Sequence, residues 1–131
     1  MLIAAAGGIV FDRQHRLLLV LRSNPPAAFS WSVPGGRCEP EEQPEAACVR
    51  EVGEETGLTV EVIRWAGRVH RPAPGGGEYV IDDFLCRVVG GTLRAGDDAA
   101  DADWFDLAGM TGLPLAAGLL EALANWRLLP V

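Results

Sequence analysis

The chain has no lysine, only three cysteines and no hydrophobic run long enough to span a membrane. All eleven basic residues are arginines, and eighteen acidic residues give a formal net charge of −7. That charge argues against non-specific binding to nucleic acid or to an acidic membrane. The cysteines Cys38, Cys48 and Cys86 form no C-x-x-C pair, and no histidine has zinc-ligand spacing to them. We therefore expect a reduced, cytoplasmic protein in which Cys48 and Cys86 lie in the core.

Internal repeats, low-complexity tracts and the basic start of a signal peptide are also missing. The opening residues MLIAAAGGIVF are apolar, and we interpret them as a buried strand rather than as a leader. With 131 residues, of which 49% are hydrophobic, the chain is long enough to form one domain around its own core.

What the sequence does contain is a loop and helix at residues 36–58, GRCEPEEQPEAACVREVGEETGL. Pro44 suits the first turn of a helix, where its missing N–H is no loss. Gly57 suits the position just after a helix end. The pattern therefore predicts a helix over residues 43–56.

Three carboxylates crowd the end of this predicted helix. Glu51, Glu54 and Glu55 fall within an arc of about 100°, flanked by Arg50. The opposite side carries Ala46, Cys48, Val49, Val52 and Gly53, so that side should pack against the core. Like charges at these spacings repel by roughly 0.2–0.5 kcal/mol per pair, and the negative end of the helix dipole disfavours them further. A bound cation is the natural compensation, and carboxylate oxygens on a rigid helix suit Mg²⁺ or Mn²⁺.

The segment resembles the Nudix box, G-x5-E-x7-R-E-U-x-E-E-x-G-U with U aliphatic, and it matches every specified position. The similarity extends to RLLLVLR at 16–22, WSVPGG at 31–36, YVIDDFLCRVVGG at 79–91 and GDDAADADWFDL at 96–107. Together these strings resemble the small Nudix hydrolases of the ADP-ribose pyrophosphatase-like and MutT-like groups. The resemblance implies one α/β domain over residues 1–131, an α/β/α sandwich with a mixed β-sheet between helices.

The remaining secondary-structure signals agree with a mixed sheet between helices. We expect strands at 2–11, 16–22, 31–33, 59–69, 78–89 and 101–107, and a closing helix at 113–127. The uninterrupted apolar run from Leu17 to Leu21 should be a strand buried on both faces. Trp31 and Trp104 are expected in the core.

The resemblance also implies roles for residues of the box. Glu51, Glu54 and Glu55 would bind the metal ion, and Glu51 or one of its neighbours would orient the attacking water. Arg50 would orient the carboxylates. Gly35 would lend its carbonyl to a metal, because a Gly-Gly turn lets the backbone approach closely. Glu42, also in the box, would support the loop or bind metal through water.

Substrate contacts are expected outside the box. Arg22, at the end of a buried strand, is a candidate phosphate contact. Asp83 matches the acidic residue before Phe in the family's strand and points to the opposite face from Asp82, which we expect to be exposed. Asp98 lies in the loop before the last strand, where Asp97 and Asp101 compete for its role. His70 and Arg71 are further polar candidates near the expected cleft.

The resemblance implies hydrolysis of a nucleoside diphosphate linked to another moiety, such as ADP-ribose to AMP and ribose 5-phosphate. The alternative within this chemistry is a (d)NTP pyrophosphohydrolase that cleans the nucleotide pool. A non-catalytic nucleotide-sensing Nudix domain is the alternative from another class. The oligomeric state, a homodimer included, stays open.

Overall fold

The computed structural model describes residues 1–23, 29–96 and 98–131. Strands are the main secondary structure of the described residues, with one long α-helix in the middle and two short α-helices near the end. In order, the elements are β1 (Leu2–Val10), β2 (Leu17–Arg22), β3 (Trp31–Ser32), β4 (Gly35–Arg37), α1 (Pro44–Thr56), β5 (Leu58–Pro72), η1 (Pro74–Gly76), β6 (Glu78–Gly91), β7 (Ala99–Phe105), α2 (Leu107–Thr111) and α3 (Leu119–Asn125).

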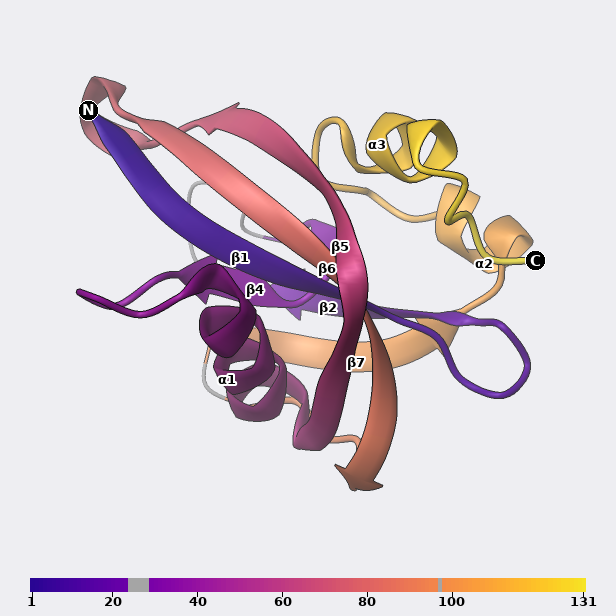
Figure 1. The fold of residues 1–131 in the computed structure, drawn as a ribbon. Helices are drawn as coiled ribbons and strands as arrows, with labels where there is room; N and C mark the ends of the chain where they lie inside the picture. The colour runs from indigo at the N-terminus through magenta and orange to yellow at the C-terminus, as the bar shows by residue number, and fades with distance from the viewer. Residues whose placement is uncertain (24–28, 97) are drawn as a thin grey trace.

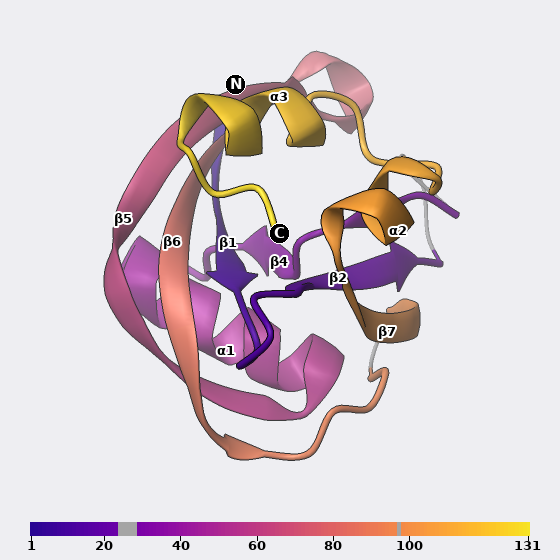
Figure 2. The same ribbon diagram turned by 90° about the vertical axis from the view of Figure 1, so that its right-hand side faces the viewer.

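The strands form two sheets (Figure 1). The larger is mixed, with the order β4-β1-β6-β5; β1 and β6 run parallel, and its other pairs are antiparallel. The smaller has the order β3-β2-β7 and is antiparallel. Turning the molecule by 90° shows α1 below the strands and α3 above them (Figure 2). The expected mixed sheet between helices is confirmed. The smaller, second sheet was not predicted from the sequence.

Two apolar clusters hold these layers together. One lies between α1 and the large sheet and contains Cys48, Val52, Phe84 and Cys86. The other lies between the two sheets and the C-terminal helices and contains Ile9, Leu19, Trp31 and Leu123. Leu18 belongs to the first cluster and Leu17 and Leu19 to the second, and residues 17–20 are 0–1% exposed, so the prediction of a strand buried on both faces is confirmed there. Trp31 and Trp104, expected in the core, both pack into these clusters.

The central helix follows the prediction closely. It begins at Pro44 and ends at Thr56, and Gly57 adopts a left-handed conformation (φ 74°) in which its N–H donates to the Gly53 carbonyl at 2.9 Å. Ala46, expected on the packing side, is exposed, while Cys48 and Val52 are fully buried. The charged side of the helix is correspondingly less exposed than the periodicity alone predicts, since Glu55 is buried.

The predicted closing helix at 113–127 is wrong over its first half. Residues 113–118 are not helical, and α3 starts only after Gly118, which has a φ of 82°. This apolar segment is instead non-helical, and its Leu115 forms an isolated β-bridge with Trp31. The short helix α2 was not predicted, although Asp106 marks its start: the Asp106 carboxylate accepts from the Gly109 N–H at 2.7 Å.

No helix in the described part of the chain has the length and apolarity to cross a membrane.

Candidate active site

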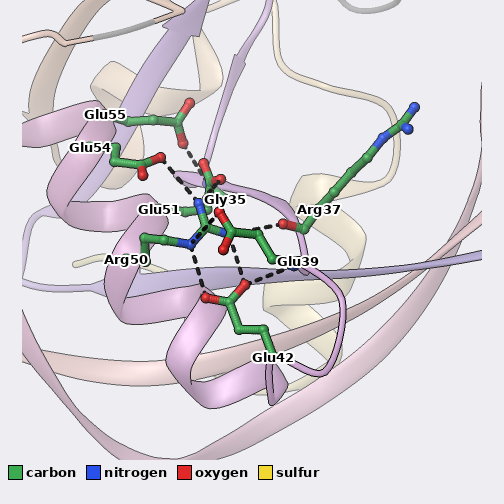
Figure 3. A network of polar contacts seen from close by, with 8 residues as sticks. All are labelled: Gly35, Arg37, Glu39, Glu42, Arg50, Glu51, Glu54 and Glu55. Carbon is green, nitrogen blue, oxygen red and sulfur yellow. Dashed lines mark hydrogen bonds and ion pairs between the residues drawn. The ribbon is translucent and has the colours of Figure 1, made fainter.

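Arg50 organises the carboxylates at the end of α1 (Figure 3). Its Nε and Nη2 donate to the two carboxylate oxygens of Glu42, both at 2.9 Å. Its Nη1 donates to Glu51 at 2.8 Å and to Glu54 at 3.2 Å. Its Nη2 also donates to the backbone carbonyl of Arg37 at 3.1 Å. One guanidinium therefore ties three carboxylates of the box to the loop that precedes the helix.

Glu42 is the carboxylate that Arg50 holds most firmly. The hydrogen bonds from Arg50 lower the pKa of Glu42 to about 2, and the Glu39 N–H adds another bond at 2.9 Å. The same contacts raise the pKa of the Arg50 guanidinium. Two roles were expected for Glu42, and its hydrogen bonds to Arg50 and to the Glu39 N–H correspond to the first, which is to hold the loop before the helix.

Glu55 lies in a different environment, in contact with the backbone of β4. The Gly35 N–H donates to Glu55 Oε1 at 2.7 Å. Burial raises the pKa of Glu55 to about 7; the Gly35 N–H and Arg22 act to lower it, and Glu51 and Asp98 act to raise it further. A carboxylate buried in this way gains if a cation binds beside it.

Gly35 and Gly36, which we expected in a turn, lie on strand β4 and leave room for this arrangement. The Gly8 N–H donates to the Pro34 carbonyl, and the Cys38 N–H donates to the Ala4 carbonyl. In this antiparallel register the backbone of Gly36 faces β1, and the backbone of Gly35 does not. The N–H and the carbonyl of Gly35 therefore both point away from β1, off the sheet edge and toward the side on which Glu55 lies. A Cβ at Gly36 would come within 2.7 Å of both carboxylate oxygens of Glu51, so a larger residue there would displace that carboxylate.

The donor set suits a hard divalent cation: Glu51, Glu54, Glu55 and the Gly35 carbonyl offer oxygen alone and carry three formal negative charges. Within the described ranges, no three His, Cys, Asp or Glu side chains already converge as a finished coordination shell. Arg50 accounts for part of this, because it holds Glu51 and Glu54. The residues thus fit Mg²⁺ or Mn²⁺ by chemistry and charge.

The carboxylates stand at one end of a cleft of about 570 Å³. All three predicted substrate contacts, Arg22, Asp83 and Asp98, line this cleft, as do Glu51, Glu54, Glu55 and Gly35. Asp98 is exposed and its backbone carbonyl accepts from the Ser23 N–H at 3.2 Å. Of its two competitors, Asp101 is exposed and does not line the cleft, and Asp97 lies outside the described residues.

Asp82 and Asp83 do point to opposite faces of β6, but the expectation of an exposed Asp82 is wrong. Asp82 is 8% exposed and accepts hydrogen bonds from Trp65 Nε1 at 3.0 Å and from Arg68 Nε at 2.9 Å. Burial opposes ionisation of Asp82, yet these bonds outweigh it and lower its pKa. The basic and aromatic partners come from the neighbouring strand β5, 14 and 17 residues earlier, and the strand propensity of Asp82 alone could not reveal them.

Asp83 faces the cleft with no such partner. It is 7% exposed, and its Oδ1 has no hydrogen-bond partner within the described part of the chain. Burial raises its pKa to about 7; Arg71 acts to lower it and Asp82 to raise it.

Of three further residues that line the cleft, only Arg71 was considered in the sequence analysis. Arg71 lines the cleft, whereas His70 is exposed and pairs with Glu78 at 2.5 Å. Arg37 and Tyr79 also line it and were not predicted. The signal for Tyr79 was present, because it shares the period of two with Asp83 along its strand.

Comparisons with known proteins agree on one family. The family model described as NUDIX domain matches residues 1–125. The ADP-ribose pyrophosphatase of Methanocaldococcus jannaschii is 40% identical over 104 residues, covering 79% of this chain and 61% of that protein. A MutT-like protein of Streptomyces ambofaciens is 33% identical over 100 residues, covering 76% of this chain and 61% of that protein. The aligned region thus spans about three fifths of these relatives.

Among solved structures, a MutT NUDIX hydrolase from Burkholderia pseudomallei superimposes with a TM-score of 0.84 at 27% identity, covering 95% of this chain and 97% of that one.

Proposed function

Because the chain belongs to the Nudix family, we propose that it hydrolyses the pyrophosphate bond of a nucleoside diphosphate linked to another moiety, with the help of Mg²⁺ or Mn²⁺. ADP-ribose, giving AMP and ribose 5-phosphate, is the favoured substrate. The observation that carries the proposal is the set of Glu51, Glu54 and Glu55 beside the Gly35 backbone, at one end of a cleft of about 570 Å³.

A pyrophosphate bears several negative charges, and the chain itself is acidic. A divalent ion held by Glu51, Glu54, Glu55 and the Gly35 carbonyl would neutralise substrate charge and make a bound water more nucleophilic. Arg50 keeps Glu51 and Glu54 in place, and one of the three glutamates accepts the proton of the attacking water. Arg22 lines the same end of the cleft, where it would contact a phosphate oxygen.

The relative from M. jannaschii supports ADP-ribose as the substrate, since its name is ADP-ribose pyrophosphatase. A relative from Bacillus subtilis, 34% identical over 97 residues and named a putative 8-oxo-dGTP diphosphatase, supports the alternative, a (d)NTP pyrophosphohydrolase. The second alternative, a non-catalytic sensing domain, has no need of a complete carboxylate set, and this chain retains all three box glutamates.

Steady-state kinetics on a substrate panel test the proposal. ADP-ribose, NADH, a dinucleoside polyphosphate, dGTP and its oxidised form are compared at one pH, with Mg²⁺, with Mn²⁺ and with a chelator. We expect hydrolysis only with metal, and a kcat/KM for ADP-ribose roughly ten- to a hundredfold above that for dGTP. This range corresponds to about 1–3 kcal/mol for a buried polar group that the wrong substrate leaves unpaired.

Each outcome changes a different part of the proposal. A higher kcat/KM for dGTP or its oxidised form replaces ADP-ribose by the nucleotide-pool alternative and leaves the metal-dependent hydrolysis intact. Turnover that persists in chelator contradicts the metal. Binding without turnover of any member of the panel favours the sensing domain.

A further inference from the structure

The part of the cleft away from the box glutamates has a floor formed by one face of the large sheet. Strand register places Gly35, Gly7, Asp83 and Gly67 in one row across β4, β1, β6 and β5. The next row on the same face consists of Arg37, Ala5, Ile81 and Val69, and Tyr79 pairs with Arg71 in the row after that. Apart from Gly67, every residue of these three rows named here lines the cleft.

Asp83 lies at the bottom of this floor because its neighbours across the sheet are glycines. A Cβ at Gly7 would come within 2.4 Å of Asp83 Oδ1. A Cβ at Gly67 would come within 2.3 Å of the Trp126 ring, so the indole of Trp126 covers that side. The Asp83 carboxyl is therefore buried at the bottom of the cleft, and its Oδ1 lacks a hydrogen-bond partner within the described residues. A buried polar atom of this kind is stabilised when a ligand supplies the missing bond.

Arg37 ends the row that contains Ala5 and Ile81, and Tyr79 lies in the next row, two residues before Ile81 on β6. Arg37 Nη2 donates to the Tyr79 hydroxyl at 3.1 Å, and the guanidinium carbon lies 5.5 Å from the ring centroid. Figure 3 shows the Arg37 side chain extending away from the glutamates. Aromatic rings and guanidinium planes are the groups on which nucleobases stack.

The spacing of these groups suits a planar ring system. Tyr79 and Asp83 are four residues apart on one strand, a separation of about 13 Å at the rise of a β-strand. Ile81 and Ala5 lie between them and offer an apolar surface. A heteroaromatic ring on that surface has a stacking partner at one end and a buried hydrogen-bonding atom at the other.

We propose that this floor is the nucleobase subsite of the cleft, in which the base lies over Ile81 against Tyr79 and Arg37 and hydrogen-bonds along its polar edge to Asp83 Oδ1. The inference rests on the proposed function, in that the ligand is a nucleotide whose pyrophosphate lies at the box glutamates. Tyr79 would provide affinity for any nucleobase, because stacking tolerates every base. Asp83 would discriminate between bases through its hydrogen bond.

Ligand binding in chelator, by calorimetry or NMR titration, tests the subsite without turnover. Adenosine, guanosine, cytidine and uridine are compared with ribose 5-phosphate, which lacks a base. Tyr79→Ala should weaken all four nucleosides by about 5- to 150-fold, the range of losing one base-stacking contact. Binding of ribose 5-phosphate should not change, and Tyr79→Phe should keep most of the nucleoside affinity.

Asp83→Asn should act differently, by changing the order of affinities among the nucleosides. Asparagine keeps the shape of the side chain but presents both an N–H donor and a carbonyl acceptor to the base. Trp65→Ala is the matched control, because Trp65 is an exposed aromatic residue of the same sheet that does not line the cleft. It should bind every nucleoside like the wild type.

Three results overturn the subsite: no nucleoside binding to the wild type at millimolar concentration, wild-type adenosine affinity in a folded Tyr79→Ala variant, or an equal loss of ribose 5-phosphate binding in that variant. The last result would instead indicate a phosphate site around Arg37 and Arg71. A protein that binds adenosine through Tyr79 but hydrolyses no member of the substrate panel refutes the proposed reaction and leaves the subsite standing.

Discussion

Asp82 and Asp83 are neighbours on β6, are almost equally buried at 8% and 7% exposure, and have opposite electrostatic surroundings. On the α1 face of the sheet, Asp82 accepts hydrogen bonds from Arg68 and Trp65, and its pKa is lowered. On the cleft face, Asp83 Oδ1 has no partner within the described residues, and burial raises the pKa of Asp83 to about 7. Burial alone therefore does not decide the state of a carboxylate; the donors that reach it do.

The same contrast divides the glutamates of the box. Glu42 is bound through both oxygens by Arg50, which lowers its pKa to about 2. Glu55 is buried beside the Gly35 backbone and has a pKa raised to about 7. Glu42, which arginine binds through both oxygens, supports the loop, whereas Glu55 faces the cleft without an arginine hydrogen bond; Glu51 and Glu54 line the cleft and also accept from Arg50.

The strongest test of this division compares Glu55→Gln with Asp82→Asn. Glu55→Gln keeps the shape and removes the charge, so kcat/KM should fall by at least about 10²-fold, the scale of losing one electrostatic contact to the transition state. Asp82→Asn removes an equally buried charge from the other face and should leave kcat/KM close to the wild type. Steady-state rates in saturating Mg²⁺ measure both, and near-wild-type turnover of Glu55→Gln contradicts its assignment as a metal ligand.

Metal binding should stabilise the fold through the cleft-facing glutamates. Mg²⁺ at about a hundred times its dissociation constant should add roughly 2.7 kcal/mol to the free energy of unfolding, provided that the unfolded chain binds none. Replacing Glu51, Glu54 and Glu55 together by Gln should shrink this gain, whereas Asp82→Asn should preserve it. Thermal melts with and without Mg²⁺ decide the matter; equal gains in wild type and triple variant place the metal elsewhere.

The smallest expected effect is the contribution of Asp82 and Asp83 to the pH dependence of the free energy of unfolding. The folded pKa of Asp82 lies below its usual 3.8, so its stabilising contribution is present above that pH and is lost as pH falls through the folded pKa. The folded pKa of Asp83 is raised to about 7, so its contribution is present below about pH 3.8 and is lost as pH rises through 7. Asp82→Asn should therefore destabilise the protein by about 1 kcal/mol at pH 6 to 8.

Asp83→Asn should remove part of the stability loss that the wild type shows between about pH 4 and pH 7. Urea unfolding at several pH values measures both variants, and the comparison with wild type cancels the other groups that titrate in this range. Parallel stability curves for wild type and Asp83→Asn would show that a donor satisfies Asp83 in solution.

Most of the fold and half of the site could be predicted because the signals are local. Pro44, Gly57 and the spacing of Glu51, Glu54 and Glu55 act within a few turns of one helix, so α1 and its carboxylates followed from the sequence. The prediction of the closing helix was wrong over residues 113–118, because their apolar spacing also suits an extended segment that packs beside Trp31.

The partners of the site residues could not be predicted, since they lie on other strands. Arg68 and Trp65 reach Asp82 from β5, and Gly7 and Gly67 leave Asp83 at the bottom of the cleft from two different strands. Tyr79 meets Arg37 only because β1 lies between β6 and β4 in the sheet.

By itself the sequence determined the helix with its crowded carboxylates, the mixed sheet between helices and the family resemblance. These depend on periodicity and spacing within short segments. The tertiary structure alone decided which donors reach each carboxylate and which carboxylates line the cleft. The physical reason is that the ionisation of a buried carboxylate depends on donors and charges within a few ångströms, and strand order and register bring those from residues distant in sequence.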